Sequence, residues 1–137
     1  MASYGSAVAA RTLVVLVDSD TDNRRAVQLR LRAGRFEVRA YASGSTMLAD
    51  AAAASPGCLV VRDQMAICDG FAVLSQMRCR GWYGSAILMT DAPGVDLDAA
   101  AAHAGFRAVV DRPSVDDVLR DAVEAATLVP PAQRGHP

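Results

Sequence analysis

The fold of this chain is decided by the stretch Leu13-Val14-Val15-Leu16-Val17-Asp18-Ser19-Asp20. Its apolar residues, most of them β-branched, predict a strand that is buried on both faces and ends at the acidic residues. The polar residues that follow begin a helix, with Thr21 or Asp22 as the expected N-cap. Gly34 stands where the end of that helix favours a left-handed backbone. A buried strand that leads directly into a helix predicts an alternating β/α chain.

The same strand-then-helix unit repeats along the rest of the chain. Further strands are predicted at residues 36–40, 58–61, 85–90 and 107–110, and further helices at 43–54, 71–80, 96–103 and 114–126. Neighbouring parallel strands need a crossover helix, and such crossovers are right-handed. We therefore expect an α/β fold, a doubly wound (βα)5 unit whose parallel five-stranded sheet is covered on both faces. The domain is expected at residues 12–127, with tails at 1–11 and 128–137.

Composition narrows the class of protein. The 137 residues carry 14 basic and 15 acidic side chains, a formal net charge of −1, and 52% of them are hydrophobic. This composition argues against a disordered chain, a membrane-spanning segment and a nucleic-acid-binding protein. The cysteines Cys58, Cys68 and Cys79 lack the spacing of a zinc site or a disulfide framework, and no signal peptide is evident. We expect a cytoplasmic protein with reduced thiols.

An open parallel sheet binds ligands beyond the carboxyl ends of its strands, so the residues at those ends indicate the function. They are Asp18-Ser19-Asp20, Arg62-Asp63, Thr90-Asp91 and Asp111-Arg112-Pro113. No glycine-rich phosphate loop follows the first strand, which argues against a nucleotide-binding protein. No nucleophile with a matching base is evident, so we expect no enzymatic turnover.

From Thr12 to Ala126, this ordered set of strand ends resembles the receiver domain of two-component response regulators. The resemblance is carried by Val17-Asp18-Ser19-Asp20, Met65-Ala66, Asp69-Gly70, Met89-Thr90, Ala104-Gly105 and Arg112-Pro113. Several of these segments fall where the family has its acidic cluster, its Met-Pro loop, its Asp-Gly pair, its Ser or Thr after the fourth strand, and its Lys-Pro pair. The resemblance implies the flavodoxin-like receiver fold and a place in the phosphorelay of two-component signalling.

The resemblance also implies a phosphoacceptor aspartate at the end of the third strand, and this chain has Arg62 there. Counting back from Asp69, or following the strand from Cys58, leads to the same position. A guanidinium cannot form an acyl phosphate or bind Mg²⁺. Asp63 is the alternative, displaced acceptor, although a shift of one residue turns a side chain to the opposite face of a strand.

The metal-binding acids implied by the resemblance are also incomplete. Ser19 replaces one of them, which leaves Asp18 and Asp20 as the carboxylates of the pocket. Mg²⁺ prefers hard oxygen ligands, and Arg62 would stand beside it, so we expect Mg²⁺ binding to be weak or absent and no cofactor to be held. We predict instead that Arg62 replaces the cation through a bidentate bond to Asp18 or Asp20.

Three further positions bear on the conformational switch that phosphorylation would trigger in a receiver domain. The lysine of the family corresponds to Arg112, which keeps the charge and changes the shape of the donor. The aromatic switch residue corresponds to Val109. Thr90 is either the hydroxyl that follows the phosphoryl group or an ordinary hydroxyl at a strand end.

These departures favour an atypical receiver, a stand-alone adaptor that binds proteins and is not switched by aspartyl phosphorylation. The expected partner is a histidine kinase, a phosphotransferase or another response regulator, with the fourth helix, fifth strand and fifth helix as the docking or homodimer face. The alternatives are a regulator that binds a small anion between Arg62 and Arg112, and a phospho-accepting receiver that uses Asp63. The first helix also carries an arginine face that is either merely solvated or a second partner site, formed by Arg24, Arg25, Arg30 and Arg32.

Overall fold

A computed structural model describes residues 11–111 and 116–128, and the strands and helices alternate along the chain as predicted. The strands are β1 (Leu13–Val17), β2 (Glu37–Tyr41), β3 (Cys58–Arg62), β4 (Ser85–Thr90) and β5 (Ala108–Asp111). The helices are α2 (Thr21–Ala33), α3 (Gly44–Ala49), α4 (Gly70–Cys79), α5 (Val95–Ala104) and α6 (Asp116–Thr127), and the 3-10 helix η1 (Ala51–Ala53) follows α3.

All five strands pair in parallel in one sheet, in the order β2-β1-β3-β4-β5. This arrangement confirms the predicted flavodoxin-like fold. The order makes β3 the neighbour of both β1 and β4, with Val17 opposite Val61 and Arg62 opposite Met89. Because the strands are parallel, the polar residues that follow β1, β3 and β4 meet at the carboxyl end of the sheet.

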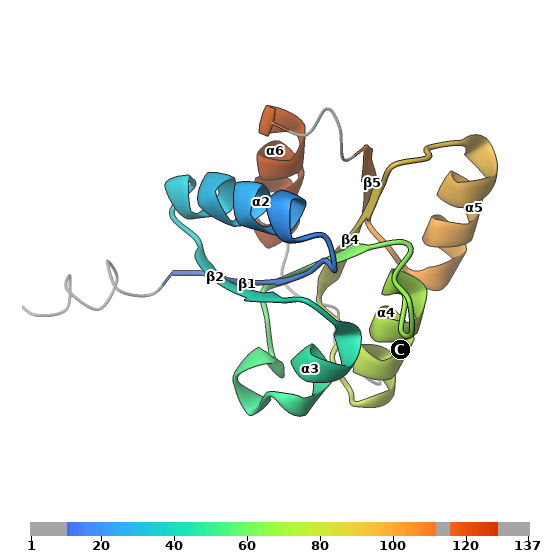
Figure 1. Ribbon diagram of the computed structural model, residues 1–137, viewed down its shortest axis with the longest axis horizontal. Coiled ribbons are helices and arrows are strands. Elements are labelled where there is room, and N and C mark those ends of the chain that lie inside the picture. Colours follow the sequence, from blue (N-terminus) through green and yellow to red (C-terminus); the bar gives the residue numbers. More distant parts are fainter. Residues whose placement is uncertain (1–10, 112–115, 129–137) are drawn as a thin grey trace, which may run out of the picture.

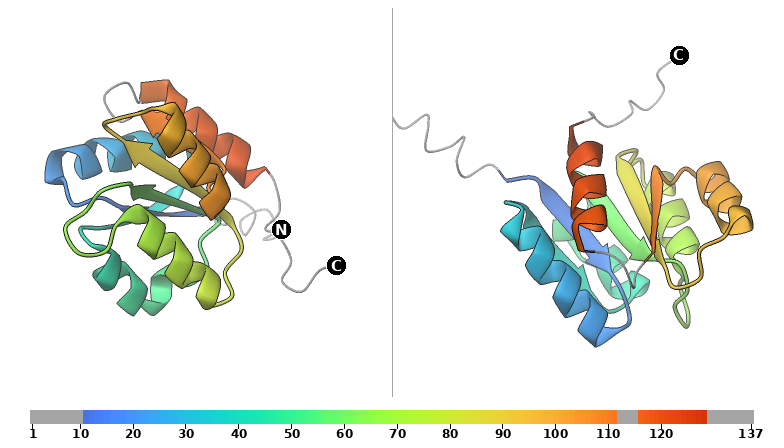
Figure 2. Two further views of the ribbon diagram at one scale, coloured as in Figure 1. Left: turned by 90° about the vertical axis from the view of Figure 1, so that its right-hand side faces the viewer. Right: turned by 90° about the horizontal axis from the view of Figure 1, so that it is seen from above.

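Two apolar layers hold the helices on the sheet. Figures 1 and 2 show the sheet with α2 and α6 on one face and α3, α4 and α5 on the other. Alternate strand residues face opposite sides, so Leu16 and Val60 pack under α2 and α6, whereas Val17 and Val61 pack under α3, α4 and α5. No helix in the described residues is long and apolar enough to cross a membrane.

The prediction of one continuous helix at residues 43–54 is wrong. The chain leaves the helical conformation at Asp50, whose backbone is extended (φ −97°, ψ 114°). Its carboxylate accepts hydrogen bonds from the Ala52 N–H at 2.9 Å and the Tyr41 hydroxyl at 2.6 Å. This local side-chain bonding competes with the helix, and the helical spacing of apolar residues does not reveal it.

Both predicted ends of the first helix also need correction. Its N-cap is Asp20, whose side chain accepts from the Asn23 N–H at 3.1 Å, and not Thr21 or Asp22. At the other end, Gly34 has φ −85°, and the left-handed residue is Arg35 with φ 72°. An arginine there carries a steric cost that glycine would not. The predicted start of the last helix at Ser114 lies outside the described residues.

We predict that Arg35→Gly raises the free energy of unfolding by about 0.5–1 kcal/mol, because relief of the left-handed strain outweighs the extra freedom of glycine in the unfolded chain. Urea denaturation measures the change. The matched control is Arg25→Gly, an exposed position inside α2, which should lower stability by about 1 kcal/mol. Equal losses in both variants would contradict the strain at position 35.

Candidate functional site

Asp18 is a carboxylate at the carboxyl end of the sheet. It directly follows β1, and its side chain is fully buried. Its Oδ1 accepts a hydrogen bond from the Asp20 N–H at 2.9 Å, and its Oδ2 accepts one from Asn23 Nδ2 at 2.6 Å. Its backbone carbonyl accepts from the Arg24 guanidinium at 2.7 Å. The start of α2 therefore wraps around Asp18 and commits both of its carboxylate oxygens.

Arg62, the last residue of β3, contacts two carboxylates. Its Nη2 donates to Asp91 Oδ2 at 2.9 Å, and its Nη1 lies 3.7 Å from Asp18 Oδ1. The Arg62 side chain is 21% exposed, whereas that of Asp91 is 43% exposed. The Nε atom of Arg62 is buried and has no hydrogen-bond partner in the described part of the chain. One guanidinium thus links the ends of β1, β3 and β4.

The predicted bidentate bond from Arg62 to Asp18 or Asp20 is wrong in its geometry. Asp18 is a partner through a single ion pair, and the Asp20 carboxylate caps α2. The shortest contact goes to Asp91, which sequence reasoning noted at a strand end without pairing it to Arg62. The sequence signal for this pairing is the position of Asp91, which directly follows the next strand in the chain after the one that ends at Arg62.

Asp63 and Thr90 form a second, separate pair. Hydrogen bonds continue the ladder one residue past β3, since the Asp63 N–H donates to the Met89 carbonyl at 2.8 Å. The Thr90 hydroxyl donates to Asp63 Oδ2 at 2.8 Å and accepts from the Ala92 N–H at 3.0 Å. Both side chains are buried. By strand alternation they belong to the face covered by α3, α4 and α5, opposite the Arg62 side chain.

The residues at the carboxyl end of the sheet do not fit a Mg²⁺ site of the kind implied by a receiver domain. Ser19 is exposed and offers a hydroxyl in place of a carboxylate, and both oxygens of Asp18 already accept hydrogen bonds. The Arg62 cation lies against Asp18 and would repel a second cation. Among the described residues, no group of three His, Cys, Asp or Glu side chains is placed to hold a metal ion.

Two of the positions singled out in the sequence complete the description. Val109, for which the resemblance implies the aromatic switch residue, is half-buried against the core cluster under α3, α4 and α5. Arg112 lies outside the described residues. The three cysteines are free thiols, of which Cys58 is buried, Cys68 half-buried and Cys79 exposed.

Comparison with known proteins agrees with the geometry. Residues 14–124 match the family described as the response regulator receiver domain. This match covers most of the chain, so the protein belongs to the receiver domain family of two-component signalling. No curated protein matches the chain by sequence.

Solved structures show the same architecture. The Vibrio cholerae chemotaxis protein CheY4 aligns with a TM-score of 0.79 at 20% identity, covering 85% of this chain and 99% of that one. The receiver domain of a putative Luxo repressor protein from Vibrio parahaemolyticus aligns with a TM-score of 0.79 at 18% identity, covering 87% and 92%. A response regulator receiver protein from Burkholderia phymatum aligns with a TM-score of 0.74 at 27% identity, covering 88% and 98%.

We predict that Arg62→Ala lowers the free energy of unfolding by about 2 kcal/mol, because it removes the guanidinium that lies 3.7 Å from the buried Asp18 carboxylate. The control, Asp91→Ala, removes the more exposed partner and should cost at most about 1 kcal/mol. Urea denaturation at low and high salt measures both. An unchanged midpoint for Arg62→Ala would show that the bridge contributes nothing.

The thiols should differ in reactivity. Burial raises the pKa of Cys58 to about 12, and burial together with the nearby Asp69 carboxylate raises the pKa of Cys68. Because the thiolate is the reactive form, iodoacetamide at pH 8 should label the exposed Cys79 first, Cys68 slowly, and Cys58 only after unfolding. Peptide mass spectrometry over time measures this order. Fast labelling of Cys68 in the folded protein would favour a redox role for it.

Proposed function

We propose that this chain is an atypical receiver domain that acts as a protein-interaction adaptor without aspartyl phosphorylation. The observation that supports the proposal is the Arg62 guanidinium, which lies at the end of β3 between the carboxylates of Asp18 and Asp91. The resemblance to receiver domains implies the phosphoacceptor at this position. A guanidinium offers no oxygen nucleophile for a phosphoryl group. It also supplies the positive charge that a divalent cation would otherwise bring to the carboxylates.

The bridge supports a single conformation in place of a switch. It ties together the ends of three adjacent strands through contacts of one side chain. The Thr90 hydroxyl, which a phosphoryl group would have to attract, is held by Asp63 and by the Ala92 N–H. The resemblance implies an aromatic switch residue at Val109, and valine has no ring that could follow a movement of Thr90. A fixed surface of this kind suits constitutive binding of a partner. The proposed function requires neither Mg²⁺ nor catalysis.

Receiver domains interact with histidine kinases, phosphotransferases and other regulators, and we propose a partner from these classes. Two of the helices expected to dock a partner carry exposed apolar side chains: Val95 in α5 is 82% exposed, and Val118 in α6 is 57% exposed. A hollow of about 270 Å³ lies between α5 and β5, lined among others by Ala101, Ala102 and Phe106. Small side chains there permit close approach of a partner or of a second copy in the cytoplasm.

The two alternative functions have weaker support. An anion held between Arg62 and Arg112 would have to compete with Asp18 and Asp91 for the Arg62 guanidinium. Phosphorylation of Asp63 would require an 8% exposed carboxylate to leave its hydrogen bond with Thr90. Both alternatives are tested by the experiment that follows.

Incubation with acetyl phosphate and Mg²⁺, followed by intact-mass analysis, should leave the mass of the protein unchanged. Beryllofluoride should likewise leave the amide NMR signals of Thr90 and Ala92 in place. An added phosphoryl group that disappears in Asp63→Ala would overturn the proposal and identify Asp63 as the acceptor. A shift of the Arg62 side-chain NMR signals on addition of inorganic phosphate would support the anion-binding alternative.

The matched gain-of-function variant carries Ser19→Asp and Arg62→Asp together. These changes place carboxylates where the resemblance implies a metal-binding acid and the phosphoacceptor. We expect this double variant to bind Mg²⁺ and to accept a phosphoryl group from acetyl phosphate, because the fold already brings these positions together. Arg62→Asn, without a nucleophile, is the control and should remain unmodified. Failure of the double variant while it stays folded would show that more than these two residues blocks phosphorylation.

A further inference from the structure

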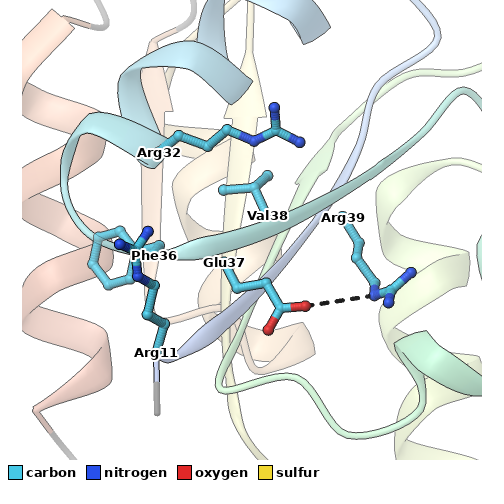
Figure 3. Close-up of a pocket in the computed structure, with 6 residues that line it drawn as sticks. All are labelled: Arg11, Arg32, Phe36, Glu37, Val38 and Arg39. Carbon is cyan, nitrogen blue, oxygen red and sulfur yellow. Dashed lines mark ion pairs between the residues drawn. The ribbon is translucent and has the colours of Figure 1, made fainter. Parts of the chain in front are cut away.

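A basic depression lies at the end of the sheet opposite to Arg62, beside the amino end of β2. Its volume is about 510 Å³, and we call it the β2 depression. Figure 3 shows the residues that line it, with Arg32 projecting from α2 and Arg39 from β2: Arg11, Arg32, Phe36, Glu37, Val38 and Arg39. Phe36 and Val38 belong to the core and form its floor.

The β2 depression carries an excess of unpaired positive charge. Arg39 Nε lies 3.9 Å from Glu37 Oε2, and both side chains are about half exposed, so this ion pair is weak. The guanidinium groups of Arg11 and Arg32 are exposed and have neither an ion pair nor a hydrogen bond within the described residues. Two cations are therefore free to meet an anion.

The same place offers an open row of backbone groups. β2 is an edge strand that pairs with β1 alone. The Glu37 N–H donates to the Thr12 carbonyl and the Tyr41 carbonyl accepts from the Asp18 N–H, so these residues face β1. In a parallel ladder the intervening residues, Val38 and Ala40, direct their N–H and C=O groups toward the open side. An edge of this kind can accept another strand.

We propose that the β2 edge binds an extended acidic segment of a partner protein by strand addition. Side chains of an added strand alternate between the two faces of the sheet. Val38 packs toward α2, which places Arg32 on that face and Glu37 and Arg39 on the other. Consecutive carboxylates of the segment would therefore meet Arg32 on one side and Arg39 on the other, with Arg11 at the amino end of the strand.

Charge argues against the other occupants. A second copy of this chain would bring the same arginines face to face, which is unfavourable. The parts of the chain outside the described residues, 1–10, 112–115 and 129–137, contain no Asp or Glu in their sequence. A separate protein with an acidic segment is the occupant that supplies both backbone pairing and negative charge. This inference does not depend on the state of Arg62.

The test is fluorescence anisotropy with a labelled peptide of sequence Thr-Val-Glu-Glu-Val-Glu-Glu-Val-Thr. We expect it to bind the full chain at low salt, and Arg11→Glu or Arg32→Glu to weaken binding by about threefold to tenfold each. Arg25→Glu, an exposed arginine of α2 outside the β2 depression, is the matched control and should bind as the unmodified protein does. Arg62→Asp should also bind normally, which separates this site from the proposed function.

Hydrogen exchange tests the backbone pairing itself. The Val38 and Ala40 amides should exchange more slowly when the peptide is bound, and a peptide with proline in place of its central valine should not bind. Equal binding of the proline peptide, or of an oligonucleotide of the same charge, would overturn the proposal in favour of a general anion site. Absence of binding would overturn it too, leaving the arginines as charges that keep the edge from pairing.

Discussion

The contact of one guanidinium with two carboxylates joins the ends of three strands in this receiver domain. The sheet order β2-β1-β3-β4-β5 places β3 between β1 and β4, so a long side chain at the end of β3 can reach residues after either neighbour. Arg62 does so, contacting Asp18 on one side and Asp91 on the other. The Asp18 carboxylate is buried, and burial of a charge is costly unless it is paired, so the Arg62 guanidinium stabilises it.

The two ends of the sheet serve different purposes in this reading. At the carboxyl end, Arg62 pairs with carboxylates that follow β1 and β4, and the proposed adaptor role rests on this contact. At the amino end of β2, Arg11 and Arg32 have no ion pair or hydrogen bond with the residues that the structure describes, so their charge is available to a partner.

Much of this architecture follows from periodicity alone. Continuous apolar runs such as Leu13–Val17 are strands buried on both faces, and the helix spacing between them requires parallel crossovers. The break at Asp50, the cap at Asp20 and the left-handed Arg35 escaped prediction because each depends on hydrogen bonds or sterics specific to one residue. Apolar spacing carries no information about such competition.

The order of apolar runs and helical spacings along the chain is enough to predict the five-stranded α/β fold, and residue position alone places Arg62 at the end of the third strand. Only the tertiary structure decided that Asp91 is the nearest partner of Arg62, that Asp63 is held by Thr90, and that arginines before β1, in α2 and in β2 share one depression. The reason is physical: the partner of a long, flexible charged side chain is chosen by what neighbouring strands bring within its reach, and sequence spacing does not encode that distance.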